Sequence, residues 1–158
     1  MCNSQLTELG ARLEQTLTIL APHAQRWTHS HWRISQGCLQ VDVEVDETSR
    51  QLILTSSRLC IVPANLRSAV AQMCDEHNRG RSGFEMKLDG GDLYCRIQYE
   101  LDGHDALNPQ FLGQLLVQIE QGGRDFVDRL LRRCADDLLI RIHHQLENDH
   151  DRPPPCPA

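Results

Sequence analysis

The stretch that decides the fold is an eight-residue alternation of apolar and polar side chains. It runs Leu39-Gln40-Val41-Asp42-Val43-Glu44-Val45-Asp46. Because successive side chains of a strand point to opposite faces, the four apolar residues share one face and the four polar residues share the other. The pattern predicts a strand in a sheet that buries one face and leaves the other in water.

Four more strands are predicted along the chain. Two follow directly, at residues 52–54 and 59–62, and Pro63 ends the second of them. A hairpin is predicted over residues 84–101, with its turn at 89–92. Such short connections favour antiparallel pairing. We therefore expect an antiparallel sheet of about five strands.

Helices are predicted before, between and after the strands. Leucines at steps of three and four mark a first helix that ends near Leu20, and a second is predicted over 64–77. Asn108-Pro109 is a typical start for a third. Gly122-Gly123 is expected to interrupt it, and a fourth helical pattern continues to about Leu146. The order helix, three strands, helix, two strands, two helices predicts an α+β fold, in which helices pack on one antiparallel sheet.

Length and composition fit one globular domain. The chain has 158 residues, of which 40% are hydrophobic and 24% charged, and both fractions are ordinary for such a domain. We expect the domain to span residues 4–147 and a disordered Pro-rich tail to span residues 148–158. The net charge is −6. This charge argues against nucleic-acid binding, because phosphate contacts need clustered basic side chains.

The location can also be predicted from composition. No apolar run approaches the roughly 18 residues of a membrane-spanning helix, and the first residues lack the pattern of a secretory signal. We therefore expect a cytoplasmic protein that does not bind membranes. The seven cysteines are expected to be thiols in that compartment, and no two of them form a CxxC pair.

The order and spacing of the central motifs resemble those of the YbjN family, which shares the type III secretion chaperone-like fold. The matching residues begin just before the second predicted helix and continue through the hairpin to the next helix. They are Val62-Pro63, Arg67, Val70, Asn78, Gly83-Phe84-Glu85, Asp89-Gly90-Gly91, Tyr94-Cys95-Arg96 and Leu107. The segment from residue 79 to 82 is more basic and richer in glycine than this family pattern. The helical pattern beyond Cys134 also extends past the usual end of the domain.

The resemblance implies a small, acidic, often dimeric protein without enzymatic activity. Relatives with this fold bind protein clients or regulate other proteins. The family has no shared catalytic residues, so the resemblance assigns no catalytic residue to this chain.

A search for catalytic and metal-binding patterns leaves one alternative. His29 and His31 lie two residues apart, so in an extended segment they would point the same way. A zinc site needs three or four ligands, and surface histidines are the simpler interpretation. The sequence carries neither a nucleophile elbow nor a phosphate-binding loop. We predict no catalytic residue and no cofactor, with a metal-dependent sensor or enzyme that uses His29 and His31 as the alternative.

Two groups of apolar residues are candidates for partner binding. Trp27 and Trp32 lie in a polar stretch outside the periodic core, where they could seal a sheet edge or bind a partner. Leu138, Leu139 and Ile142 could pack on the domain or against a second chain. The leading hypothesis is a chaperone-like or regulatory adaptor, not an enzyme, that binds a specific protein client and forms a homodimer.

Overall fold

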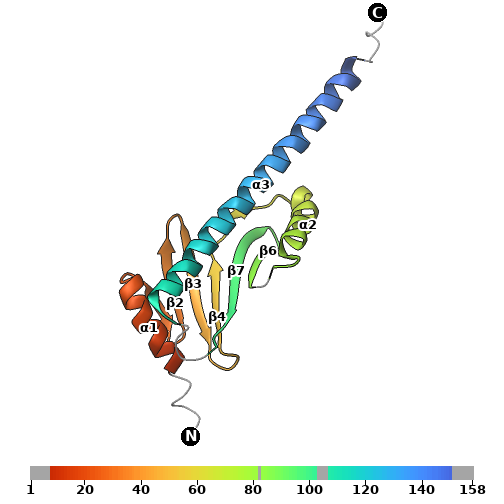
Figure 1. Cartoon of the computed structure of the whole chain (residues 1–158). Helices are drawn as coiled ribbons and strands as arrows, with labels where there is room; N and C mark the ends of the chain where they lie inside the picture. Colours follow the sequence, from red (N-terminus) through yellow and green to blue (C-terminus); the bar gives the residue numbers. More distant parts are fainter. Residues whose placement is uncertain (1–7, 82, 103–106, 151–158) are drawn as a thin grey trace, which may run out of the picture. The chain divides into compact units, whose positions relative to one another are not determined.

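The computed structural model describes residues 8–81, 83–102 and 107–150, with side chains as far as residue 136. Its elements, drawn in Figure 1, are α1 (Glu8–Leu20), β1 (Gln25–Thr28), β2 (His31–Gln36), β3 (Leu39–Asp46), β4 (Gln51–Ser56), β5 (Cys60–Ile61), the 3-10 turn η1 (Ala64–Leu66), α2 (Arg67–Asn78), β6 (Phe84–Asp89), β7 (Asp92–Glu100) and α3 (Pro109–His150). The chain divides into two compact units, Met1–Arg124 and Asp125–Ala158. The sheet lies in the first unit. The second contains the C-terminal part of α3.

The described strands form one antiparallel sheet in the order β1-β2-β3-β4-β7. β7 pairs with β4 and the short β5 along one side and with β6 along the other. β1 and β6 are therefore the outer strands on the two sides of the sheet, and the two-residue strand β5 pairs with β7 alone among the described strands. The expected α+β class with an antiparallel sheet is confirmed.

The described part of the chain has seven strands, two more than the sequence predicted. The additional strands are β1 and β2, which come from the polar stretch around the two tryptophans. All four residues of β1 are exposed, so this strand has no apolar alternation to detect. β2 turns only Trp32 and Ile34 into the core, which is too few for a clear pattern.

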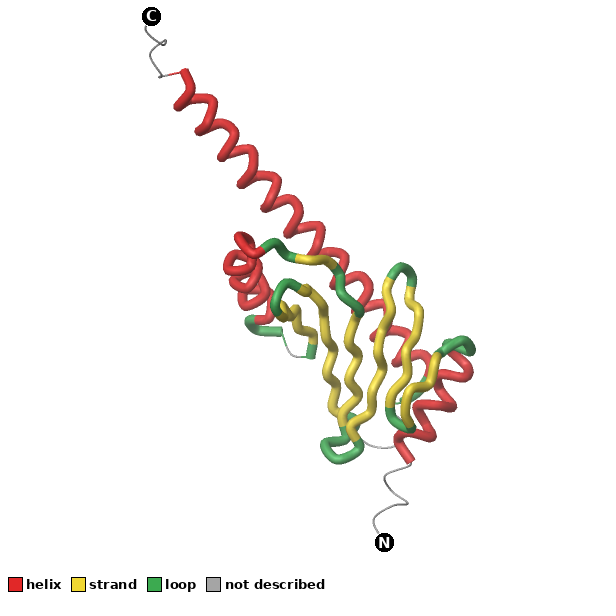
Figure 2. Tube along the Cα trace, turned by 180° about the vertical axis from the view of Figure 1, so that it is seen from behind, coloured by secondary structure: helices red, strands yellow, loops and turns green. Residues whose placement is uncertain are grey.

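One face of the sheet is covered by α1 and by the part of α3 within the first unit, and the other face is left open, while α2 lies beside the edge strand β6 (Figure 1). α1 and the part of α3 within this unit lie on the same face in Figure 1, and Figure 2 looks onto the opposite face. The covered face of β3 consists of Val41, Val43 and Val45, all buried, as the alternation in the sequence predicted. The other buried side chains of this layer include Leu13, Leu17, Leu52, Leu54, Leu93, Ile97, Leu112, Leu116 and Ile119.

The expected interruption of the last helix at Gly122-Gly123 is wrong, because α3 continues as one helix from Pro109 to His150. The two glycines instead allow the helix to approach the sheet closely. A Cβ at Gly122 would lie 2.5 Å from Cζ of Phe84. One at Gly123 would lie 3.3 Å from Sγ of Cys95. A side chain at position 122 would therefore clash and one at position 123 would be tightly packed. This close approach accounts for two glycines in a helix, although glycine has a low helix propensity.

The edge at β6 is closed by a side chain of α2. Nδ2 of Asn78 donates to the carbonyl of Met86 at 2.9 Å, and the Met86 amide donates to Oδ1 of Asn78 at 2.8 Å. These are the two hydrogen bonds that a neighbouring strand would make at this position. Asn78 therefore occupies the pairing site of an edge that could otherwise bind another chain.

Replacing Asn78 by Ala is expected to lower the free energy of unfolding by about 1–3 kcal/mol, because the amide and carbonyl of Met86 lose their partners. Gln72→Ala is the matched control. It removes an exposed hydrogen bond to Glu76 on the same helix and should cost little. Urea denaturation measures both. Equal losses in the two variants would contradict the role of Asn78.

Candidate functional site

The second edge strand, β1, carries the largest exposed aromatic side chain among the described residues. Trp27 is 55% exposed. β1 pairs only with β2 among the described strands, so its outer edge is not paired with another strand. An unpaired edge strand presents backbone amides and carbonyls to solvent and can pair with another extended chain.

Trp27 lies against two polar side chains of β2, Arg33 and His31. The guanidinium carbon of Arg33 lies 4.1 Å from the centre of the indole ring, which is a cation–π contact. The ring of His31 lies 5.5 Å away, centre to centre. Trp27, His31, Arg33 and the carboxylate that holds Arg33, Asp42, are called the Trp27 cluster below.

Asp42 of β3 fixes the position of Arg33. Its Oδ1 and Oδ2 accept hydrogen bonds from Nε and Nη2 of Arg33 at 2.7 and 3.0 Å, so the pair is bidentate. This bonding lowers the pKa of the Asp42 carboxyl below its ordinary value of 3.8 and raises the pKa of Arg33. Nε2 of His31 lies 3.6 Å from Oδ1. The cluster is thus held in place by the sheet itself, since Arg33 and Asp42 face each other in register.

Asp42→Asn is expected to lower the free energy of unfolding by about 0.5–1 kcal/mol at neutral pH, which is typical of a partly exposed ion pair. The pKa of Asp42 is lower in the folded chain than in the unfolded chain. The pair therefore stabilises the fold above the unfolded pKa, and this contribution is lost as the pH falls through the folded pKa. Urea denaturation from neutral pH to about pH 3 checks whether the difference shrinks. A difference of constant size would contradict the assignment.

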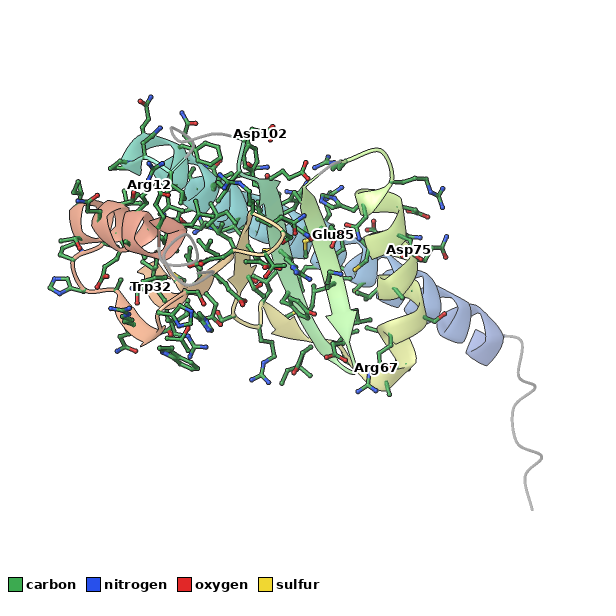
Figure 3. All side chains as sticks on the ribbon, turned by 90° about the horizontal axis from the view of Figure 1, so that it is seen from below. Arg12, Trp32, Arg67, Asp75, Glu85 and Asp102 are labelled. Carbon is green, nitrogen blue, oxygen red and sulfur yellow. The ribbon has the colours of Figure 1, made fainter. Side chains whose placement is uncertain are left out.

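The other tryptophan lies in the core. Trp32 is 3% exposed, and Figure 3 labels it below α1. The guanidinium of Arg26 lies 5.6 Å from its ring and pairs with Glu14 of α1 at 3.0 Å. Trp32 therefore seals the sheet beneath α1, and of the two tryptophans Trp27 alone offers a surface to a partner.

The two histidines of the metal alternative occupy different settings. His29 lies exposed in the turn between β1 and β2, and His31 is half-buried beside Asp42. Among the residues that the structure describes, no group of three or more His, Cys, Asp and Glu side chains is placed to hold a metal ion. No observation of the structure favours the metal alternative over protein binding.

The remaining partner candidates, Leu138, Leu139 and Ile142, belong to α3, but their side chains lie outside the described residues. Residues 151–158 of the tail predicted over 148–158 also lie outside them, whereas α3 extends to His150. The extent of the domain therefore stays a prediction. None of the described helices is sufficiently long and apolar to span a bilayer.

Two features of the site were not predicted from the sequence. Arg33 and Asp42 come from different strands, so only the β2–β3 register brings them together. The closure of β6 by Asn78 likewise depends on how α2 packs beside that strand. Figure 3 shows α2, marked by Asp75 and Arg67, next to the strand that carries Glu85. Asn78 is one of the residues that carry the family resemblance, and this resemblance is the feature of the sequence that marks it.

Comparison with known proteins supports the fold. One chain of the solved structure entitled "Crystal Structure of the ExsC-ExsE Complex" superposes with a TM-score of 0.54 at 9% sequence identity. The match covers 75% of this chain and 90% of that chain. This similarity agrees with the expected type III secretion chaperone-like fold. No known protein family and no curated protein sequence matches the chain, so membership of the YbjN family stays a prediction.

Proposed function

We propose that this chain is a chaperone-like adaptor without enzymatic activity that binds an extended segment of a protein client at the β1 edge. The observation that carries the proposal is the difference between the two edges of the sheet. Asn78 occupies the pairing site of β6, whereas β1 has four exposed residues and an exposed tryptophan. The open edge is the one that can accept an added strand.

The client segment pairs with the backbone of β1 and places an apolar side chain on Trp27. Backbone hydrogen bonds supply affinity in this binding mode, and side-chain contacts supply specificity. A tryptophan offers a large apolar area with little conformational freedom to lose, which is why it is enriched at binding hot spots. The contact with Arg33 holds the indole ring in one orientation before the client arrives.

The similarity to the ExsC–ExsE complex supports the proposal at the level of the fold. We further propose that the chain acts as a homodimer in the cytoplasm.

Two buried cysteines, Cys74 and Cys95, are free thiols whose pKa is raised to about 11 by burial. Free thiols are usual in a reducing compartment, which supports the proposed location.

Affinity capture of the tagged chain from lysate of its own host tests the client-binding role. Two tagged forms are compared, the unmodified chain and Trp27→Ala, and mass spectrometry quantifies what co-purifies. The proposal predicts a protein that is enriched with the unmodified chain and depleted with the variant. A set of co-purifying proteins that is the same for both forms would contradict it.

A further inference from the structure

A row of side chains crosses the open face of the sheet, with one residue from each of β2, β3, β4, β7 and β6. Each residue is paired in register with the next, and the row runs Arg33, Asp42, Thr55, Arg96 and Glu85. Residues that are directly opposite on neighbouring strands point to the same face, and Figure 2 looks onto this one. Trp27 stacks on Arg33. The row therefore begins beneath the tryptophan of the proposed client site.

Arg96 is the charged member of the row that has no partner. Arg33 is bonded to Asp42, and Oε2 of Glu85 lies 3.1 Å from Nζ of Lys87. None of the described residues gives Arg96 a hydrogen bond or an ion pair, and its Nε is buried in this state although the side chain as a whole is half-buried. A buried N–H group without an acceptor lowers stability. Such an exception to hydrogen-bond pairing is typical of a functional residue.

We propose that an acidic side chain of the client binds to Arg96, so that the client continues from Trp27 across the open face. This inference rests on the proposed function and names a side chain that the client must carry. A carboxylate is the partner that the same row gives to its other arginine, Arg33, in a bidentate pair. Because the enclosed Nε holds the Arg96 guanidinium in place, little side-chain freedom is lost on binding.

The charge of the chain makes this contact selective. The net charge is −6, which repels acidic peptides in general. An acidic segment therefore binds only where a cation is available, and Arg96 is an arginine whose charge no described carboxylate pairs. Ile53 lies on the same face, half-buried on the neighbouring strand β4. It offers an apolar contact to the methylene groups of an aspartate or glutamate.

The spacing of the strands predicts where the acidic residue lies in the client. Arg33 and Arg96 are three strands apart, or about 14 Å at about 4.8 Å per strand. An extended segment advances about 3.3 Å per residue. The acidic residue should therefore lie about four residues from the side chain that contacts Trp27.

A phage library of random peptides, selected on the full chain and on its variants, tests this inference. Arg96→Glu reverses the charge at the site. Arg81→Glu makes the same change at an exposed arginine between α2 and β6 and is the matched control. The unmodified chain and Arg81→Glu should enrich peptides with Asp or Glu about four residues from an apolar residue. Arg96→Glu should enrich Lys or Arg at that position.

Arg96→Gln provides a second variant with a smaller change. It should raise the Kd of a peptide enriched by the unmodified chain about tenfold, through loss of charge-assisted hydrogen bonds. Its midpoint of urea denaturation should be unchanged or higher, because Arg96 has no internal partner to lose. A marked fall in that midpoint would show that Arg96 serves the fold instead, which overturns the inference.

Trp27→Ala, selected in parallel, separates the two proposals. Enrichment that depends on Trp27 but not on Arg96 overturns this inference and leaves the proposed function standing. Enrichment that depends on Arg96 but not on Trp27 keeps the acidic contact and contradicts the β1 site. Enriched peptides without an acidic residue overturn the inference. If the unmodified chain enriches no peptide, both proposals are overturned.

Discussion

Gly122→Ala will destabilise the fold, although alanine is the better helix former. The new methyl group would lie 2.5 Å from Phe84 Cζ, and the Phe84 ring is itself buried and packed edge-on against His77. Overpacking of this kind costs about 1–3 kcal/mol. The gain in helix propensity is at most about 1 kcal/mol. The expected net result is a loss of up to about 2 kcal/mol in the free energy of unfolding, measured by urea denaturation.

Gly113 of the same helix provides the matched control. A Cβ there meets only Leu20 Cδ1, at an ordinary contact distance of 3.5 Å. Gly113→Ala should therefore stabilise the fold by about 0.5–1 kcal/mol. Phe84→Leu should offset part of the loss in Gly122→Ala, because the two residues touch and are expected to couple. Equal effects of the two glycine substitutions would contradict the close approach of α3 to the sheet.

Trp27→Ala will weaken client binding more than any other single surface change. Truncation of a hot-spot tryptophan costs about 2 kcal/mol or more, which corresponds to a roughly 30-fold increase in Kd. The stability of the free chain should barely change, because Trp27 is an exposed side chain. Isothermal titration calorimetry with the client recovered by capture measures the change in Kd.

Ile19→Ala controls for the loss of any exposed apolar side chain. Ile19 is 72% exposed on α1 and lies outside the Trp27 cluster. Its removal should leave the Kd unchanged within about twofold. If Trp27→Ala also binds with unchanged affinity, the client does not use β1, and the proposed site is wrong.

The periodicity of apolar residues predicts those helices and strands that have one buried face and one exposed face. The alternation at residues 39–46 marks β3 because one face of that strand is buried and the other is wet. The same reasoning located α2 and the hairpin of β6 and β7, with small shifts at their ends. It could not find β1, because an edge strand with four exposed residues is held by its hydrogen bonds to β2.

The continuity of α3 through Gly122-Gly123 could not be predicted either, because it depends on packing against the sheet. Propensity treats two glycines as a break in a helix, but here their missing side chains make room for Phe84 and Cys95. The candidate site likewise depends on contacts between residues that are distant in the sequence. Trp27 could be named from the sequence, whereas Arg33, Asp42 and Asn78 acquire their roles only through strand register and helix packing.

Amide hydrogen exchange of the chain with and without its client tests the central claim most directly. The claim is that the client adds a strand to the open edge and leaves the closed edge unchanged. We predict new protection for those amides of β1 that do not already pair with β2, and unchanged exchange along β6, where Asn78 already pairs with Met86. Protection of another element, with unchanged exchange at β1, would contradict it.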